Sequence, residues 1–224
     1  MFKREMENYK IFKKIIGLSA ILFLVGSMVF VVFEPMVINA VTDTAIVTAT
    51  VSQEITISAP SDTSFSASIP GVSGNPGAPV TASLTWNTKT NNSTGYNLKL
   101  KASQANALYK DVTYYFEDYT ITPTYNWSNP SSGSAQFGFA VDAATSADVV
   151  AAFKDATGVC GSGTTDGSCW SGFNGITDIN AVNRSTETTS TGEAVTINFK
   201  AESNAKLLEE GSYTATITAT AALN

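Results

Sequence analysis

The residues able to carry out chemistry are few in this chain, and histidine is absent from all 224 positions. Histidine is the usual general base near neutral pH and the commonest metal ligand. A Ser-His-Asp or Cys-His nucleophilic site is therefore excluded. Two cysteines with scattered carboxylates do not supply the usual zinc ligands either. We predict a protein that is not an enzyme, with no catalytic residue, no bound metal and no cofactor.

The acidic side chains follow no catalytic or calcium-binding pattern. Glu117 and Asp118 are adjacent, so on a strand they would point to opposite faces. Asp166 is followed by glycine, but the Asp/Asn ladder and the final Glu of a calcium loop are missing. Two carboxylates can also meet through folding alone, as glycosidases require, although no local feature favours this.

Cys160 and Cys169 are the only cysteines, and the eight residues between them include three glycines. In an exported chain this spacing predicts a disulfide-closed loop, whereas a redox centre would favour Cys-x-x-Cys. Chain entropy predicts that such a loop stabilises the fold by roughly 2–3 kcal/mol. Trp170 and Phe173 follow the second cysteine. We expect them to pack on the disulfide, and a recognition tip is the alternative.

Aromatic residues are dense between Tyr109 and Trp127. Such rings can stack on sugars when they lie on an exposed sheet face, but aromatics are also enriched inside strands. Consecutive rings at 114–116 must point to both faces of a strand, so at least one is exposed or meets the insertion described below. The candidate ligand-binding aromatics are Tyr114, Tyr115, Trp127 and Trp170.

Residues 1–40 differ from the rest of the chain. Residues 1–14 are polar and hold five basic side chains, and Ile15–Phe33 contains no charge. As a helix this run would be about 28 Å long, close to a hydrocarbon core of roughly 30 Å. Basic residues in front of such a run keep the N-terminus inside. We therefore predict that residues 41–224 lie outside the membrane, secreted or at the cell surface.

The fate of this leader has two alternatives. In one, it is a signal peptide cut after Ala40, with Ile38 and Ala40 at the −3 and −1 positions. In the other, it remains as an N-terminal membrane anchor through residues 15–33, because the apolar run is longer than a usual signal core. The domain prediction is accordingly a leader at 1–40 and one extracytoplasmic domain at 41–224.

Residues 41–224 carry 8 basic and 16 acidic side chains, a formal charge of −8. This balance argues against nucleic-acid binding, which needs clustered positive charge. Only 14% of the whole chain is charged. We expect a surface covered by hydroxyl and amide side chains rather than by charged ones, which is common in secreted β proteins.

Alternation of apolar and polar residues is the dominant pattern in residues 41–224, and it predicts strands with one buried face. Two such layers make an antiparallel β-sandwich of Ig-like or fimbrial type. The alternating segments are 45–51 with 55–59, then 80–86, 96–102, 137–141, 195–201 and 213–221.

Connections between these segments are predicted from turn residues. The loop Asn91–Gly95 joins two alternating segments and suggests a hairpin. Ser146 begins a segment typical of a short helix that ends near Asp155, with Val149, Val150 and Phe153 on its inner side. Residues 104–190 break the simple alternation, so we expect an insertion there that contains this helix and the disulfide loop.

Two segments resemble bacterial exported surface β-sandwich proteins. Thr44–Val51 with Ile55–Ile57 is similar to the first strand of spore-coat-protein-U-like fimbrial domains, and Gly211–Thr218 resembles the last strand of those domains and of WxL-type cell-wall proteins. The resemblance implies a β-sandwich at the cell surface. The chain lacks the early cysteine of the first family and the Trp-x-Leu motif of the second, so neither strand donation by a chaperone nor peptidoglycan attachment is carried over.

These observations predict a non-enzymatic structural protein of the cell surface or envelope that associates with itself, or with other envelope proteins, by strand pairing. Thr44–Val51 is the first candidate for pairing and Tyr213–Ala221 the second. The alternative is an extracellular module that binds glycans or cell-wall polymers through the four candidate aromatics.

Overall fold

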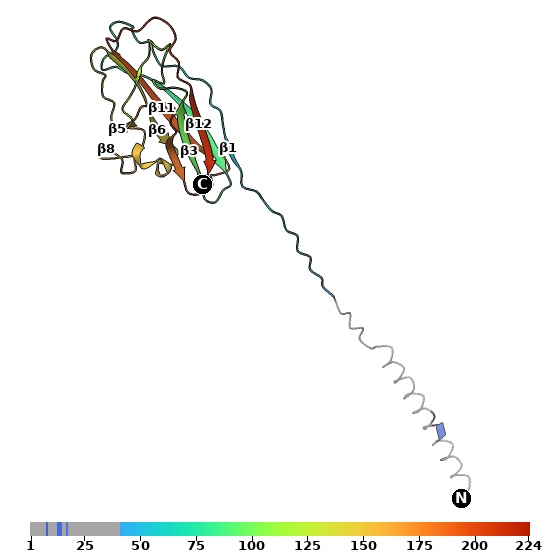
Figure 1. The fold of residues 1–224 in the computed structure, drawn as a ribbon. Helices are drawn as coiled ribbons and strands as arrows, with labels where there is room; N and C mark the ends of the chain where they lie inside the picture. Colours follow the sequence, from blue (N-terminus) through green and yellow to red (C-terminus); the bar gives the residue numbers. More distant parts are fainter. Residues whose placement is uncertain (1–7, 9–12, 15–16, 18–40) are drawn as a thin grey trace. The chain divides into compact units, whose positions relative to one another are not determined.

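The computed structural model describes residues 8, 13, 14, 17 and 41–224. The chain divides into two units, Met1–Thr50 and Val51–Asn224 (Figure 1). All of the predicted apolar run except Gly17, and the predicted cut after Ala40, lie outside the described residues. None of the helices formed by the residues that are described has the length and apolar character needed to cross a bilayer.

The larger sheet is built around its longest strand, β11. Strand order is β1-β2-β11-β6-β4, and all pairs are antiparallel except β4 with β6. The strands are β1 (Ile55–Ile57), β2 (Val80–Thr90), β4 (Glu117–Asp118), β6 (Ser134–Ala143) and β11 (Glu193–Asn204).

A second sheet has the order β10-β3-β12 and is antiparallel throughout. Two short ribbons, β5 with β9 and β7 with β8, surround the disulfide. The strands are β3 (Tyr96–Ala102), β10 (Ile179–Arg184), β12 (Ile217–Leu223), β5 (Thr124–Tyr125), β7 (Asp155–Ala156), β8 (Val159–Cys160) and β9 (Cys169–Trp170).

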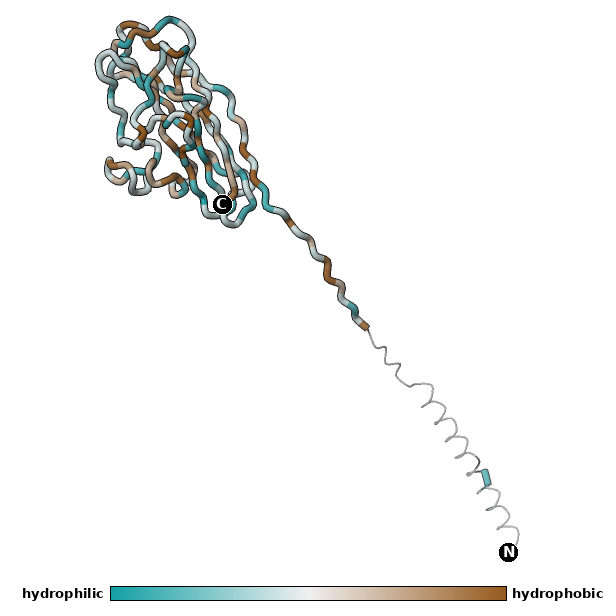
Figure 2. The backbone as a smooth tube through the Cα atoms, in the orientation of Figure 1, coloured by the Kyte–Doolittle hydropathy of each residue, from teal (hydrophilic) through white to brown (hydrophobic). Residues whose placement is uncertain are grey.

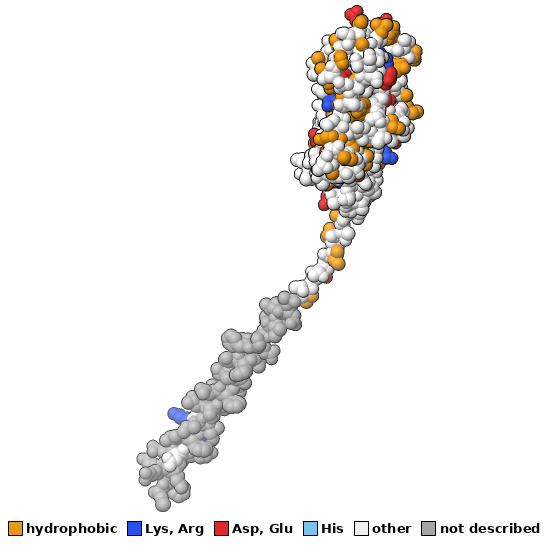
Figure 3. Space-filling model, turned by 90° about the vertical axis from the view of Figure 1, so that its left-hand side faces the viewer, with side chains coloured by type: hydrophobic (Ala, Val, Ile, Leu, Met, Phe, Trp, Pro, Cys, Tyr) orange, Lys and Arg blue, Asp and Glu red, His pale blue; other side chains and the backbone are white. Residues whose placement is uncertain are grey.

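The hydrophobic core lies between the two sheets. Val195, Ile197 and Phe199 of β11 are buried, while Thr196 and Asn198 between them are less covered. Leu98 and Leu100 of β3 are buried in the same cluster. Apolar and polar positions alternate along the strands in Figure 2, and charged side chains are few on the face of the domain that Figure 3 shows. The predicted all-β, sandwich-like fold is confirmed.

The predicted hairpin across Asn91–Gly95 is wrong. Thr90 at the end of β2 pairs with Ile55 in the larger sheet, whereas Tyr96 at the start of β3 pairs with Leu223 and Arg184 in the other. The loop therefore crosses from one sheet to the other. Each of its flanking strands has an apolar face, and the two faces bury each other when they lie in opposite layers.

The predicted strand at Thr44–Val51 is also absent. Residues 41–54 have no regular structure and all are exposed. A strand needs a neighbour to bond its backbone groups, and the described residues offer none to this segment. The last strand starts at Ile217 rather than at Tyr213, because Thr214 forms an isolated bridge with Tyr109 instead.

The predicted helix from Ser146 to about Asp155 is two 3₁₀ turns instead. The turns are η1 (Ser146–Asp148) and η2 (Ala151–Phe153). Val149 and Val150 between them are extended, and Val149 bridges Val182 of β10. Pairing with β10 thus competes with helix formation at two β-branched residues. Val149 and Phe153 are buried, as their predicted inner position requires.

Candidate functional site

The predicted disulfide is present and joins two short ribbons. The Cys160 and Cys169 sulfur atoms are bonded, and their strands, β8 and β9, belong to different ribbons. Cys169 is buried. Other contacts also hold the enclosed loop, since the Gly161 amide donates to the Lys154 carbonyl (3.0 Å) and the Asp155 amide to the Thr165 carbonyl (2.7 Å).

Trp127 and Trp170, two of the four candidate aromatics, come together on the larger sheet. Trp127 stacks on Tyr119 with ring centroids 4.5 Å apart and meets Trp170 edge-on at 5.7 Å. Its indole Nε1 donates to Glu202 Oε2 (2.6 Å). The Lys200 amine lies 4.0 Å from the centroid of Trp170. Burial lowers the pKa of Lys200. Trp170 is buried, so its ring is largely occupied by the protein itself.

Tyr114 and Tyr115 lie elsewhere and do not extend this cluster. Both are half-buried, and the Lys206 amine lies 4.3 Å from the Tyr115 ring centroid. The Tyr114 amide donates to Asp111 Oδ1 (2.9 Å), which closes a tight turn. The four candidate aromatics therefore do not form one stacking platform.

The carboxylates remain dispersed. Within residues 41–224 and the few described positions before them, no three acidic or cysteine side chains are grouped so as to hold a metal. Asp118 accepts bonds from the Asn106 and Ala107 amides (both 3.0 Å), and burial raises its pKa. Asp142 also has a raised pKa, first through burial and then through the nearby Asp166. The Ala143 amide donates to Asp166 Oδ2 (3.0 Å). Backbone amides therefore bond to both Asp118 and Asp166, which gives these two carboxylates structural roles.

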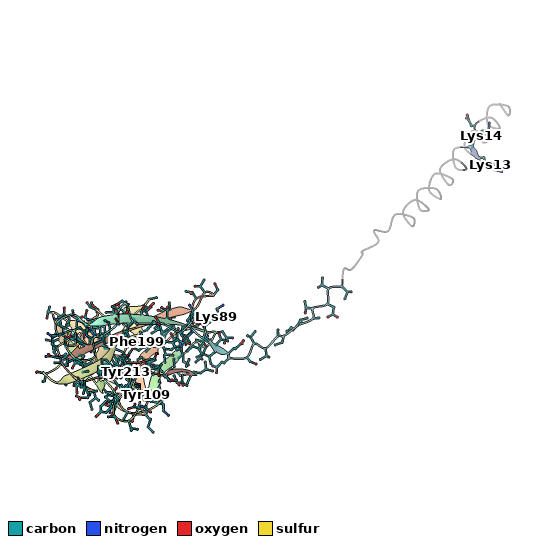
Figure 4. All side chains as sticks on the ribbon, turned by 90° about the horizontal axis from the view of Figure 1, so that it is seen from above. Lys13, Lys14, Lys89, Tyr109, Phe199 and Tyr213 are labelled. Carbon is teal, nitrogen blue, oxygen red and sulfur yellow. A yellow bond between two sulfur atoms is a disulfide. The ribbon has the colours of Figure 1, made fainter. Side chains whose placement is uncertain are left out.

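An open groove runs along one side of the sandwich and has a volume of about 520 Å³. The buried side chains of Leu108, Phe137 and Phe199 reach into it from the core. The segments 62–65 and 212–217 form its two walls, with Ala82 and Leu84 of β2 between them. Figure 4 marks Phe199 and Tyr213, which both line the groove.

One wall of the groove is an unpaired strand edge. The Thr214 amide and carbonyl both bond to Tyr109, and the Thr216 carbonyl accepts from the Ser103 amide. The backbone groups of Tyr213 and Ala215 therefore point the other way, and no described residue bonds to them. Their side chains, with that of Ile217, are only partly buried against the core. Both the backbone and the apolar face are thus available to a further strand.

The exposed segment Thr44–Val51 has complementary properties. In an extended chain Ala45, Val47, Ala49 and Val51 share one side. Val47 is 93% exposed and Val51 81% exposed. Large apolar side chains are seldom left in water along a continuous stripe without an interaction that uses them.

Asn91 holds the chain where this segment ends. Its side-chain Nδ2 donates to the Ser52 carbonyl (2.9 Å), and its Oδ1 accepts from the Glu54 amide (2.7 Å). Gln53 between them donates through Nε2 to Asn92 Oδ1 (2.9 Å). Asn91 thereby acts as a strand neighbour would, and keeps Ser52–Glu54 extended in line with β1. We name these three bonds the Asn91–Asn92 clamp.

Comparisons with known proteins identify no relative. No protein-family model matches the chain, and neither does any curated protein or solved structure. The candidate site therefore rests on the residues and geometry described above.

The groove and the clamp were not predicted from the sequence. The groove combines residues that are far apart in the sequence, such as Phe65 and Tyr213, which are 148 positions apart. The sequence places Asn91 and Asn92 in a turn and does not predict that they bond to Ser52–Glu54. Two adjacent amides next to a predicted strand are the one signal that could have indicated side-chain bonding to a neighbouring segment.

Proposed function

We propose that this chain is an exported, non-enzymatic structural protein of the cell surface or envelope that associates with further copies of itself by strand pairing. The observation that carries the proposal is Thr44–Val51, a segment with a strand pattern and no strand partner among the described residues. An extended segment of this kind can add to the open edge of another sheet, where main-chain bonds supply affinity and alternate side chains supply specificity.

Two further observations support an extracytoplasmic structural role. Disulfides form and persist in oxidising compartments, and the Cys160–Cys169 bond joins two parts of the fold. The chain has no histidine, and the carboxylates of Asp118 and Asp166 accept hydrogen bonds from backbone amides.

The test uses the full chain, expressed with its own leader in a host with an oxidising export compartment. The exported species is purified, in mild detergent if it keeps the leader. Size-exclusion chromatography with light scattering and negative-stain electron microscopy then follow its state over a concentration series. We expect ordered oligomers or filaments that grow with concentration.

The matched variants separate strand pairing from other causes of association. Val47→Ser with Val51→Ser removes two apolar side chains from the exposed stripe, and we expect it to abolish assembly while the circular dichroism of the domain is unchanged. Thr48→Ser with Thr50→Ser is the control and should assemble normally. A chain that stays monomeric at every concentration would refute the proposal, as would assembly that both variants leave intact.

One observation favours glycan binding as a second candidate function. A shallow depression of about 550 Å³ on the larger sheet has the Lys200 amine and hydroxyl or amide groups of Thr81, Ser83 and Asn198 in its lining. Such groups can bond to sugar hydroxyls. A glycan array tests this candidate, which requires binding that is lost in Lys200→Ala and Asn198→Ala. Binding that survives both changes, or no binding at all, would reject it.

A further inference from the structure

We infer that Thr44–Val51 of one copy is received in the side groove of a second copy, where it pairs with the free edge at Tyr213–Ile217. The inference rests on the proposed function and assigns the acceptor that the function requires. The larger sheet ends at β1 and the smaller one at β12 on this side of the sandwich. A strand placed in the groove would lie between the segments 62–65 and 212–217 that line it, and would cover the free edge of the second segment.

The floor of the groove is apolar, so a strand that binds there needs apolar side chains on the face that contacts the floor. Phe137 and Phe199 are almost fully buried there, but Leu84 and Ile217 beside them are only partly covered. Side chains of a strand alternate between the core and solvent. The stripe at Ala45, Val47, Ala49 and Val51 supplies small apolar groups at that period, and small groups suit a floor already filled by phenylalanine rings.

The backbone groups of Tyr213 and Ala215 have no hydrogen-bonding partner among the described residues. A donated strand would bond to them and extend the smaller sheet beyond β12. Eight residues, 44–51, span about 26 Å at roughly 3.3 Å per residue, and the six residues of the wall at 212–217 span about 20 Å. The segment is therefore long enough to cover this wall.

The direction of the chain at the clamp favours a second copy over the same copy. β1 runs along β2 from Thr90 toward its start, since Ile55 pairs with Thr90 and the Ser66 amide bonds to the Thr81 carbonyl. To enter the groove of its own copy, the preceding segment would have to reverse its direction at Ser52–Glu54. Such a reversal would break the Asn91–Asn92 clamp, whereas pairing with a second copy leaves its three bonds intact.

Cysteine cross-linking of the full chain tests this acceptor. A chain with Val47→Cys and a second chain with Ala215→Cys are mixed, allowed to assemble and oxidised mildly. We expect a disulfide-linked dimer that disappears on reduction. The control replaces Ala215→Cys by Asn180→Cys, which lies on β10 at the opposite edge of the smaller sheet and should give at least tenfold less dimer.

A second measurement fills the groove without cysteine chemistry. Ala215→Trp places an indole in it, and we expect the concentration needed for assembly to rise at least tenfold. Thr214→Trp adds the same ring on the exposed face of the same edge and should leave that concentration unchanged. If Ala215→Trp does not fold, the cross-linking result decides.

The outcomes separate the acceptor from the function. One outcome is assembly that depends on Val47 and Val51 while Val47→Cys cross-links to Asn180→Cys rather than to Ala215→Cys. That result would refute the groove as the acceptor and leave the proposed function standing. A monomer in which Val47→Cys and Ala215→Cys of one chain cross-link to each other would overturn the second copy as the occupant. Absence of any assembly would remove the proposed function, and the inference with it.

Discussion

Asn92 is fully buried although it lies in a connecting loop. Its Nδ2 donates to the Gly95 carbonyl (2.7 Å), and its Oδ1 accepts from Gln53 Nε2 (2.9 Å) and Thr94 Oγ1 (3.1 Å). One side chain therefore fixes the crossing between the two sheets and also reaches the segment before β1. The amide takes this role because it donates and accepts at once.

Asn92→Ala should lower the free energy of unfolding by about 2–3 kcal/mol, because a buried loop loses two or three bonds and keeps unsatisfied partners. Urea denaturation measures the change. Ser93→Ala is the control, since Ser93 is exposed, and it should fall within about 0.5 kcal/mol of wild type. Equal effects of the two changes would show that the crossing does not depend on this amide.

Tyr96 gives the domain a pH dependence on the alkaline side. Burial raises the pKa of Tyr96 to about 12, and the Glu193 carboxylate acts in the same direction. In the unfolded chain the pKa is roughly 10. The folded state therefore holds a proton that the unfolded state has lost between these two values. The stability contributed by this group is complete below pH 10 and is lost as the pH rises toward 12.

Tyr96→Phe should reduce this loss, by up to roughly 2.5 kcal/mol at pH 12. The melting temperature of wild type and variant is compared from pH 8.5 to 11.5, and the wild-type curve should fall more steeply above pH 10. The other tyrosines are common to both proteins and cancel in the difference. Parallel curves would contradict the assigned origin of the shift.

The disulfide belongs to the scale of elements, because it ties one short ribbon to another. A double change, Cys160→Ser with Cys169→Ser, should lower the free energy of unfolding by roughly 2–3 kcal/mol, the chain-entropy value for so short a loop. The main sheets do not pass through this loop. Far-ultraviolet circular dichroism of the folded variant should therefore match wild type, and a lost β spectrum would contradict this prediction.

At the same scale, the sequence predicted where strands occur better than it predicted which strands lie next to each other in a sheet. Alternation placed β2, β3 and β11 correctly because one face of each is more deeply buried than the other, and it also found β6, which is buried on both faces at its centre. It could not show that β2 and β3 lie in different sheets, since a short loop serves a hairpin and a crossing alike. Nor could it locate the groove, because the free edge at Tyr213 exists only once Thr214 has paired with Tyr109.

For single residues too, the sequence predicted some structural roles and could not predict others. Two cysteines allow one intramolecular pairing, so the sequence sufficed to predict the Cys160–Cys169 bond. Trp170 and Trp127 were candidates for ligand binding, but their orientation depends on Glu202 and Lys200, which come from a strand far away in the sequence. Packing against such distant residues cannot be inferred from residue type and spacing.

At the scale of the whole molecule, Val51–Asn224 should unfold as one cooperative unit. Residues of both sheets and of the 104–190 region, such as Leu98, Ile197 and Phe153, share one hydrophobic cluster. In Trp86→Phe, fluorescence reports only Trp127 and Trp170, which lie in that region. Its urea transition should coincide with circular dichroism. An earlier fluorescence transition would show that the region is a separate folding unit.

The pairing of β2 with β11 also governs when the molecule can fold. Val80 lies opposite Ala201, and Thr88 opposite Glu193, so the larger sheet joins residues more than 100 positions apart. Contacts of such long range make folding slow. A chain that lengthens from its N-terminus cannot complete this sheet until nearly all of it has been made. Until then the chain remains unfolded, and an unfolded chain is the form that can pass through a narrow protein-translocation channel.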